Sequence, residues 1–451
     1  MTSAFAVAQA VPGGPLPGPN PLFPADNWWN VDVTSAPVDL KSAALIAHIG
    51  GTRALHPDFG GDAGPTAIYG MVYITVPGTQ PLVEMTFDYP TESDYGAPGR
   101  PLGYPIPNQA KTLPHWIEGG YPGNCDRTLP TPQTSPCAGD NHMLIVDTDN
   151  RLLFETFNTR CLPADDANCT WSAGSGAIFS LDSNARRPDT WTSADAAGLA
   201  ILPGLVRYDE AYGASPIKHA FRFTVQNSFD YVYPGSHDAG STVGALPMGT
   251  RMRLKPGVTV ASADAGVQRI VQAMKTYGLI VADNGSNMYI QGTYDTRWDN
   301  GLLNPAFGAL HASDFEVIQL GWRPPLGPLQ LKTLTPCRLL DTRLAAGNLG
   351  GPALANGVER TFSVAGQCGI PPGARAISAN VTAVNASTAG LIRLFATHSG
   401  PSAASAVSFA AGKSRANNAI IWLSPEQGLT ALFEGASGST HLIIDVNGAF
   451  P

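Results

Sequence analysis

Charged side chains are scarce in this chain of 451 residues, because Asp, Glu, Lys and Arg together make up only 14% of it. Basic residues are the scarcer kind: 27 Lys and Arg stand against 35 Asp and Glu, which gives a net charge of −8. No stripe of Lys or Arg is present, so the sequence argues against a nucleic acid partner. No apolar run reaches the length of about 18 residues that a membrane helix needs, so no transmembrane segment is predicted.

Several familiar catalytic signatures are also missing. Neither the phosphate-binding G-x-x-x-x-G-K-[ST] loop nor the zinc-binding H-E-x-x-H helix occurs. Gly174-Ser175-Gly176 lacks the spacing of the G-x-S-x-G nucleophile elbow. No spacing of His, Cys, Asp or Glu requires a metal ion, so no cofactor and no metal site are predicted, although a structural calcium ion stays compatible with the sequence.

Glycine and proline are abundant, with 49 Gly and 39 Pro. Such a composition disfavours long surface helices and is typical of loop-rich β structure. A chain of this length has room for more than one buried core. We therefore expect a mainly β protein, with a large β-sandwich-like N-terminal domain containing a few helices and a smaller, all-β C-terminal sandwich or barrel.

The six cysteines fall into three local couples. Short loops within each couple and the lack of any C-x-x-C motif favour disulfides over zinc. Six cysteines allow many connectivities, so the pairing is a hypothesis. The predicted couples are Cys125 with Cys137, Cys161 with Cys169, and Cys337 with Cys368.

The N-terminus points to export from the cell. Residues 3–10 contain an apolar run and a small-x-small site, and they resemble the end of a signal peptide that lacks a basic n-region. Disulfides also imply an oxidising compartment. Together these features predict a secreted, extracellular protein.

Proline-rich segments divide the chain. Residues 1–24 read as a signal remnant followed by a Pro/Gly-rich arm, and residues 322–329 as a semi-rigid linker. Residues 25–321 form the predicted catalytic domain and residues 330–451 the predicted accessory domain. Within the former, helices are expected at residues 42–49 and 262–277. Strands are expected at residues 69–76, 82–87, 143–146, 152–157, 176–181, 220–225, 279–282 and 288–291, the last two joined by a turn at residues 283–285.

The C-terminal part opens with the segment 336–343, PCRLLDTR, and closes with the segment 442–450, LIIDVNGAF. Between them lie about eight short β-branched runs with turn signals at the spacing of a sandwich or barrel. This pattern resembles an accessory β-domain of secreted, modular bacterial proteins. The resemblance implies a role in attachment or substrate targeting.

A second resemblance covers most of residues 22–320. It is carried by the segments 173–184 (AGSGAIFSLDSN), 191–199 (WTSADAAGL) and 202–210 (LPGLVRYDE). These resemble a family of secreted bacterial domains without an assigned activity. The resemblance implies one large domain and carries over no catalytic residue.

Polar and aromatic residues concentrate between residues 171 and 223. Asp195 has two interpretations, since residues 192–195 also fit the start of a capped helix. Asp209 and Glu210 fit either catalysis or an exposed turn. The candidate substrate-binding residues are Trp171, Trp191, Tyr208, Arg222 and Tyr233, whose rings could stack on sugars or whose charge could neutralise an acid.

His142 and Glu155 form the most specific geometric hypothesis. Residues 142–147 and 151–157 fit a hairpin, and a loop of two or four residues would place both side chains on one face. Such a pair is either an acid/base unit or a structural ion pair. His219 alternates with phenylalanines and fits a core histidine or a catalyst, while His237 lies in an aromatic loop. The candidate catalytic residues are therefore Glu155, Asp195, Asp209, Glu210, His142, His219 and His237.

Three functions fit these features. The first is a secreted glycoside hydrolase that cleaves an extracellular polysaccharide with two carboxylates. The second is a polysaccharide lyase, in which His142, His237 or Tyr233 removes a proton and Arg222 neutralises a uronate. The third is a non-catalytic protein that binds a carbohydrate or a cell-surface glycan. The expected partner in each case is a polysaccharide.

Overall fold

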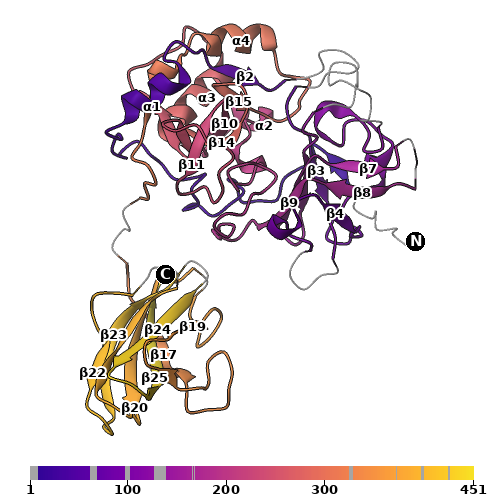
Figure 1. The fold of residues 1–451 in the computed structure, drawn as a ribbon. Helices are drawn as coiled ribbons and strands as arrows, with labels where there is room; N and C mark the ends of the chain where they lie inside the picture. The colour runs from indigo at the N-terminus through magenta and orange to yellow at the C-terminus, as the bar shows by residue number, and fades with distance from the viewer. Residues whose placement is uncertain are drawn as a thin grey trace. The chain divides into compact units, whose positions relative to one another are not determined.

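The computed structural model describes residues 9–60, 69–96, 102–125, 139–164, 166, 168–324, 329–371, 373–397, 401–424 and 427–451. The chain divides into two compact units, Met1–Pro324 and Pro325–Pro451. Most of the predicted signal segment and residues 325–328 of the predicted linker lie outside the described residues. The prediction of a mainly β protein is confirmed, since strands are the dominant regular structure in both units (Figure 1).

The first unit contains a six-stranded mixed sheet. Its helices surround this sheet (Figure 1), with α3 packed against β13 and α1 against β16. In spatial order the strands are β16 (Phe315–Val317), β13 (Arg251–Leu254), β14 (Leu279–Asn284), β10 (Phe221–Val225), β15 (Tyr289–Gln291) and β2 (His56–Asp58). The helices are α1 (Ser42–Ile49), α2 (Tyr208–Ala211), α3 (Ala265–Thr276) and α4 (Asn300–Gly308).

A five-stranded sheet forms the other part of this unit. One face of β5 and β6, which carries Leu144, Val146 and Leu153, shares a core with the six-stranded sheet. The opposite face packs on a smaller core around Trp171 and the short sheets nearby. The strands are β1 (Val11–Pro12), β3 (Tyr73–Val76), β5 (Met143–Asp147), β6 (Leu152–Phe157) and β9 (Ser175–Ser180).

The remaining elements of the unit are short. They include two small sheets and five turns of 3₁₀ helix. The strands are β4 (Met85–Phe87), β8 (Thr170–Ala173) and β7 (Arg160–Leu162) in one sheet, and β11 (Ser228–Tyr231) and β12 (Leu246–Met248) in the other. The 3₁₀ turns are η1 (Pro90–Glu92), η2 (Asn108–Lys111), η3 (Glu118–Gly120), η4 (Leu202–Gly204) and η5 (Ala312–Asp314).

One predicted hairpin forms and another does not. β5 and β6 pair antiparallel with Asp147 opposite Leu152, as expected from the sequence. The strands at 279–284 and 289–291 also form, but they are not neighbours. β10 lies between them, parallel to β14 and antiparallel to β15. The Asp-Asn-Gly segment therefore ends a strand without closing a hairpin, since a long-range pairing with β10 replaces the local one.

The second unit is a β-sandwich. One sheet has the order β17 (Lys332–Asp341), β25 (Ser439–Phe450), β20 (Ala376–Val384) and β23 (Arg415–Trp422), with β18 (Leu354–Ala355) also paired to β25. The other has the order β19 (Glu359–Ser363), β24 (Gly428–Gly435), β21 (Gly390–Ala396) and β22 (Val407–Phe409). Alternate residues of β20, such as Ala379 and Val381, enter a core that the two sheets share.

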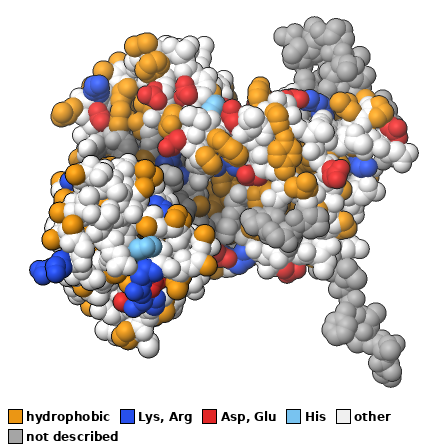
Figure 2. Space-filling view, turned by 60° about the horizontal axis from the view of Figure 1, so that its bottom comes forward, with side chains coloured by type: hydrophobic (Ala, Val, Ile, Leu, Met, Phe, Trp, Pro, Cys, Tyr) orange, Lys and Arg blue, Asp and Glu red, His pale blue; other side chains and the backbone are white. Residues whose placement is uncertain are grey.

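Two of the predicted disulfides are present. Cys161 in β7 is bonded to Cys169, and Cys337 in β17 to Cys368. The third predicted couple includes Cys137, which lies outside the described residues. None of the helices in the described part of the chain has the length and apolar character needed to cross a bilayer. On the face shown in Figure 2, basic side chains lie singly or in small groups and form no continuous tract.

Candidate functional site

The candidate site begins on one polar face of the six-stranded sheet. Thr224 of β10 pairs with Asp283 of β14, and Gln291 of β15 pairs with Asp58 of β2. Paired residues project from the same side of a sheet, and residues two apart along a strand do so as well. Arg222 therefore shares a face with Thr224 and Asp283. The opposite face of β10 carries Phe221 and Phe223 into the core.

Arg222 is fixed by a buried carboxylate. Its Nε and Nη2 donate to the two oxygens of Asp195 at 2.9 and 2.6 Å, and both side chains are at most 2% exposed. Asp283 is 3.7 Å from the same guanidinium. Two parallel bonds between a planar guanidinium and a carboxylate fix both groups in orientation. Arg222 therefore holds Asp195 firmly and leaves Asp283 as an outer neighbour.

His142, at the start of β5, approaches from the other sheet. Its Nδ1 is 2.6 Å from Glu118 Oε2, and its Nε2 is 3.1 Å from the carbonyl oxygen of Ala194. Both ring nitrogens face acceptors, so both must donate, which only the imidazolium form does. Although burial opposes the charge, Glu118 raises the pKa of His142 to about 9. His142 is therefore a fixed cation and is not available as a base.

Glu155 lies in the same interior, on the face of β6 that also carries Leu153. Its carboxyl oxygens accept the backbone N–H groups of Ile201 and Leu202 at 2.8 and 2.9 Å. Burial raises the pKa of Glu155 to about 7, although these two hydrogen bonds oppose the shift. Because the side chain is fully buried, it anchors the loop before η4 and is closed to a polymer substrate.

Three carboxyl groups reach the surface around this buried set. The side chains of Glu118 and Asp283 are 26% and 23% exposed, and Asp58 is half-buried. Burial, and then the charge of Glu118, raises the pKa of Asp58. Burial opposes ionisation of Glu118 as well, but the charge and hydrogen bonds of His142 lower its pKa overall. Two neighbouring carboxyl groups are thus pushed in opposite directions, Asp58 toward the acid and Glu118 toward the carboxylate.

Asp283 differs from both. Burial, and then the charge of Asp195, raises its pKa to about 7, while Arg222 and His142 oppose the shift. The Gln291 side chain acts to lower the pKa of Asp58, is 6% exposed, and has an enclosed Oε1 that accepts no hydrogen bond. Within the described residues, no three His, Cys, Asp or Glu side chains are arranged to bind a metal ion. The groups of the site that reach solvent are therefore carboxyl groups, while the amide oxygen of Gln291 is enclosed.

A hollow of about 490 Å³ lies where β2 and β15 begin, and its lining includes neither Asp58 nor Gln291. His56 and Tyr289 line it, and they pair with each other two residues along the strands from the Asp58–Gln291 pair. Their rings are 4.3 Å apart. Arg53 and Asn304 lie elsewhere in its wall. A hollow of this size accommodates a sugar-sized ligand next to His56 and Tyr289.

The structure brings four of the predicted site residues into one buried network: His142, Glu155, Asp195 and Arg222. His142 and Glu155 share a face of the hairpin, as expected, but the carboxylate bound to His142 is that of Glu118. The helix expected to start at residues 192–195 is absent. These residues form an irregular, mostly buried loop, because the Asp195 carboxylate binds Arg222 instead of capping a helix.

Glu210 and His219 meet in a second, separate group. His219 Nε2 is 2.9 Å from Glu210 Oε2, and Arg207 is 2.5 Å from the other oxygen of Glu210. His219 Nδ1 also faces the carbonyl of Ala220, so this group ties α2 to the segment before β10. Asp209 is 66% exposed, and its nearest cation is Arg207 at 3.5 Å. Both residues lie in the helix α2 and not in the exposed turn that was one of the two interpretations; Asp209 is exposed, whereas Glu210 is largely buried.

The predicted aromatic residues do not form a shared platform. Trp171 is buried in the smaller core, with no free ring face. Tyr208 packs against Tyr212 and Trp298, and Arg297 lies 4.1 Å above its ring. Trp191 is half-buried beneath Arg187. These rings consequently have neighbours of their own over the faces that a sugar would need.

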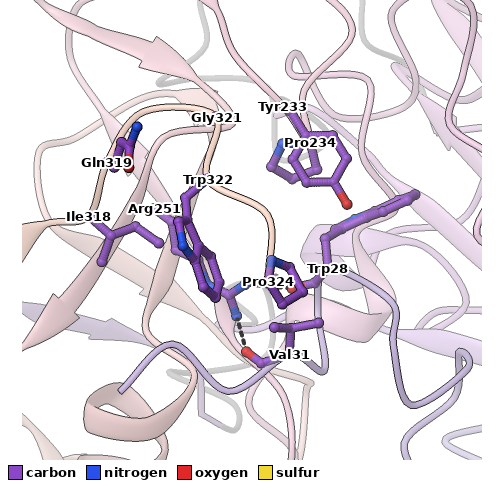
Figure 3. A pocket seen from close by; sticks show the side chains of 10 residues that line it. All are labelled: Trp28, Val31, Tyr233, Pro234, Arg251, Ile318, Gln319, Gly321, Trp322 and Pro324. Atoms are coloured by element: carbon purple, nitrogen blue, oxygen red, sulfur yellow. Dashed lines mark hydrogen bonds between the residues drawn. The ribbon is translucent and has the colours of Figure 1, made fainter. Parts of the chain in front are cut away.

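Tyr233 lines a different pocket, shown in Figure 3 with Trp28 and Trp322. Arg323 lies 3.9 Å from its ring centre, and the pocket volume of about 20 Å³ has room for only one water-sized molecule. His237 lies elsewhere, with Nδ1 donating to Ala196 O and Nε2 3.8 Å from Glu92. Neither residue faces Asp58 or Glu118 in any contact that the structure shows.

The residues missed from the sequence are Asp58, Glu118, Asp283 and Gln291. Asp58 follows a proline, and Glu118 precedes two glycines, so both look like ordinary turn residues. The sequence predicts a hairpin turn at Asp283, which hides its place in a strand. The one local signal for Asp58 is the short strand β2, His56–Asp58, which is followed by Phe59.

No known protein-family model matches this chain, and no curated protein matches it significantly. The two resemblances noted from the sequence therefore stay predictions.

Proposed function

We propose that the protein is a secreted glycoside hydrolase, with Asp58 as the general acid and Glu118 as the base or nucleophile. The two groups are neighbours, yet only Glu118 has a buried cation bound to it. Glycosidases need one carboxyl group that keeps its proton and another that stays ionised. This asymmetry between Asp58 and Glu118 is the observation that carries the proposal. The disulfides support an extracellular site of action.

His142 then acts as a positioning residue. It donates to Glu118 from behind, is 2% exposed, and is itself held by Ala194 O. In the reaction, Asp58 would donate its proton to the glycosidic oxygen as that bond breaks, while Glu118 would activate water or attack the anomeric carbon. The hollow beside His56 and Tyr289 supports binding of an adjoining sugar unit.

The lyase alternative receives less support from the same residues. Its neutralising cation, Arg222, is buried and already bound by Asp195. Of its three candidate bases, His142 has both ring nitrogens engaged, His237 Nδ1 donates to Ala196 O, and Tyr233 lies under Arg323 in a pocket that holds one water-sized molecule. A lyase needs a free base and a cation that reaches the uronate.

The test is product analysis with a panel of neutral, amino-sugar and uronate polysaccharides, by mass. We expect saturated oligosaccharides from the native protein. Asp58→Asn and Glu118→Gln should each lower kcat/KM by about 10²–10⁴-fold, and Asp58→Asn should also remove the alkaline limb of the pH–rate profile. Asp209→Asn makes the same charge change at an exposed site and should stay near the native rate.

Thermal melting shows whether each variant is folded. Unsaturated products, lighter by one water, would show that the protein is a lyase and not a hydrolase. Binding to a glycan without any product would favour the attachment role, and full activity in a folded Asp58→Asn would remove Asp58 from the mechanism.

A further inference from the structure

The hollow of about 490 Å³ next to β2 and α4 has several polar side chains in its wall and no acidic one. These polar residues are Thr52, Arg53, His56, Tyr289 and Asn304. No Asp or Glu is found among the described residues that line the hollow. The guanidinium of an arginine is always charged in proteins and offers five N–H donors. A ligand that enters the hollow therefore meets one permanent positive charge together with several hydrogen-bond donors.

The polar groups of the hollow are fixed at the backbone and open at their tips. Arg53 donates its backbone N–H to Gly50 O at 2.8 Å, and its carbonyl accepts from Ala312 N–H at 2.9 Å, whereas its exposed guanidinium binds no described residue. The rings of His56 and Tyr289 lie 4.3 Å apart and are half-buried. Their polar atoms form no hydrogen bond within the described part of the chain. A ligand therefore finds these groups on a backbone that is already ordered, which lowers the cost of binding.

The hollow adjoins the proposed general acid along one strand. His56 and Asp58 are two residues apart in β2, so their side chains project from the same face and lie about 7 Å apart along the strand. His56 also acts to lower the pKa of Asp58, as expected of neighbouring groups. A sugar chain with one unit at Asp58 can therefore place an adjoining unit in the hollow.

We propose that the hollow binds an acidic sugar unit, which carries a carboxylate or a sulfate group, and that Arg53 pairs with this anion. A guanidinium binds two oxygens of such a group through parallel hydrogen bonds. A neutral sugar would leave the guanidinium without an anionic partner. The inference deepens the proposed hydrolase by naming its substrate class. Its sugar part rests on that proposed function, and its acidic part rests on the hollow alone.

The test uses the full chain and three soluble probes of equal length: neutral cello-oligosaccharides, oligogalacturonates with carboxylates, and carrageenan oligosaccharides with sulfates. Binding by calorimetry and product masses are both measured. We expect at least one acidic probe to bind about tenfold more tightly than the neutral probe, with a difference that shrinks as salt is added. The tighter of the two acidic probes distinguishes a carboxylate from a sulfate. Equal or tighter binding of the neutral probe would contradict the inference.

Arg53→Gln removes the charge from an exposed side chain and keeps its backbone hydrogen bonds. We expect a native melting temperature, about tenfold weaker binding of the preferred acidic probe, and unchanged binding of the neutral probe. Tyr289→Phe keeps the ring, removes the hydroxyl, and should weaken the acidic probe severalfold. Lys218→Gln makes the same charge change as Arg53→Gln at an exposed position outside the hollow, and should bind as the native protein does. Native affinity of a folded Arg53→Gln for the acidic probe would overturn the inference.

The outcomes separate this inference from the proposed reaction. The expected binding order without any cleavage would support the acidic ligand and remove the hydrolase. Cleavage of neutral chains alone, at the native rate in Arg53→Gln, would keep the hydrolase and overturn the acidic ligand. Absence of binding by all three probes would also overturn the inference, while the wider product panel would still decide the hydrolase.

Discussion

At the scale of single residues, the interior of the first unit holds more ionisable groups than a β core normally tolerates. Glu155, Asp195, Arg222 and His142 are all nearly inaccessible to solvent. Each is retained because another group satisfies it: Arg222 for Asp195, backbone N–H groups for Glu155, and Glu118 for His142. Burying charge without such partners would cost several kcal/mol.

These buried groups predict how stability depends on pH. The pKa values of Glu155 and Asp283 are raised to about 7, and that of His142 to about 9. In each case the folded state binds the proton more tightly than the unfolded chain. The contribution of Glu155 and Asp283 to stability is therefore lost as pH rises from about 4 to 7. The contribution of His142 is lost between about pH 6.5 and 9.

The free energy of unfolding should fall less steeply between pH 4.5 and 7 in Glu155→Gln than in the native protein. Over this range Glu155 contributes on the order of 3 kcal/mol to that free energy. The remaining slope should belong largely to Asp283. Denaturant unfolding at a series of pH values measures the effect, with Asp209→Asn as the control. An unchanged slope in Glu155→Gln would mean that Glu155 titrates normally in the folded protein.

At the scale of elements, local signals predicted the strongly periodic segments. The helix expected at 262–277 is α3, and the helix expected at 42–49 is α1. α3 begins at Asp264, whose Oδ1 accepts the N–H of Val267 at 2.8 Å, and Gly278 follows its end at φ +77. A side chain at Gly278 would meet the carbonyl oxygen of Met252 at 2.2 Å, so only glycine fits there.

Asp264→Ala should cost about 1–2 kcal/mol, because it removes both the N-cap bond and the hydrogen bond from Tyr212 Oη at 3.0 Å. Asp264→Asn keeps a capping oxygen and should lose less. Chemical denaturation of both variants measures the difference. Equal losses would show that the negative charge, and not the capping oxygen, stabilises the helix.

Only part of the candidate site could be predicted from the sequence, because the rest depends on strand pairings between distant segments. His142 and Glu155 follow from one hairpin, so their shared face could be deduced from alternation. Asp58, Asp283 and Gln291 come together only because β10 inserts between β14 and β15 and β2 pairs at the end. No local pattern encodes these long-range pairings, and Glu118 joins them from a short 3₁₀ turn.

At the scale of the whole molecule, the two units have separate cores and separate disulfides. The first contains the Cys161–Cys169 bond and the second the Cys337–Cys368 bond. In the second unit, Asp445 on β25 binds Arg338 on β17, and Arg343 binds Asp341. The Arg338–Asp445 pair joins its first and last strands, while the Arg343–Asp341 pair is local to the end of β17.

Replacing Cys337 and Cys368 together by Ser should therefore destabilise the second unit alone. Opening a loop with a sequence separation of 31 residues should cost about 4 kcal/mol. Scanning calorimetry of the full chain should show two unfolding transitions, and only one of them should have a lower midpoint temperature than in the native protein. Replacing Cys161 and Cys169 should lower the other, and a shift of both transitions by either pair would mean that the units unfold together.

The loop from Ala194 to Leu202 has no regular secondary structure before η4, yet hydrogen bonds hold its backbone and side chains at four places. His142 binds Ala194 O, Arg222 binds Asp195, Ala197 N–H bonds to Ala282 O, and Glu155 holds the N–H groups of Ile201 and Leu202. Surface loops usually accept inserted or deleted residues. In this loop a single inserted residue would move every hydrogen-bonding group after it away from its partner on another strand. Its length is therefore as constrained as its composition, and relatives that share this network should keep the same number of residues between the carbonyl at 194 and the amide at 201.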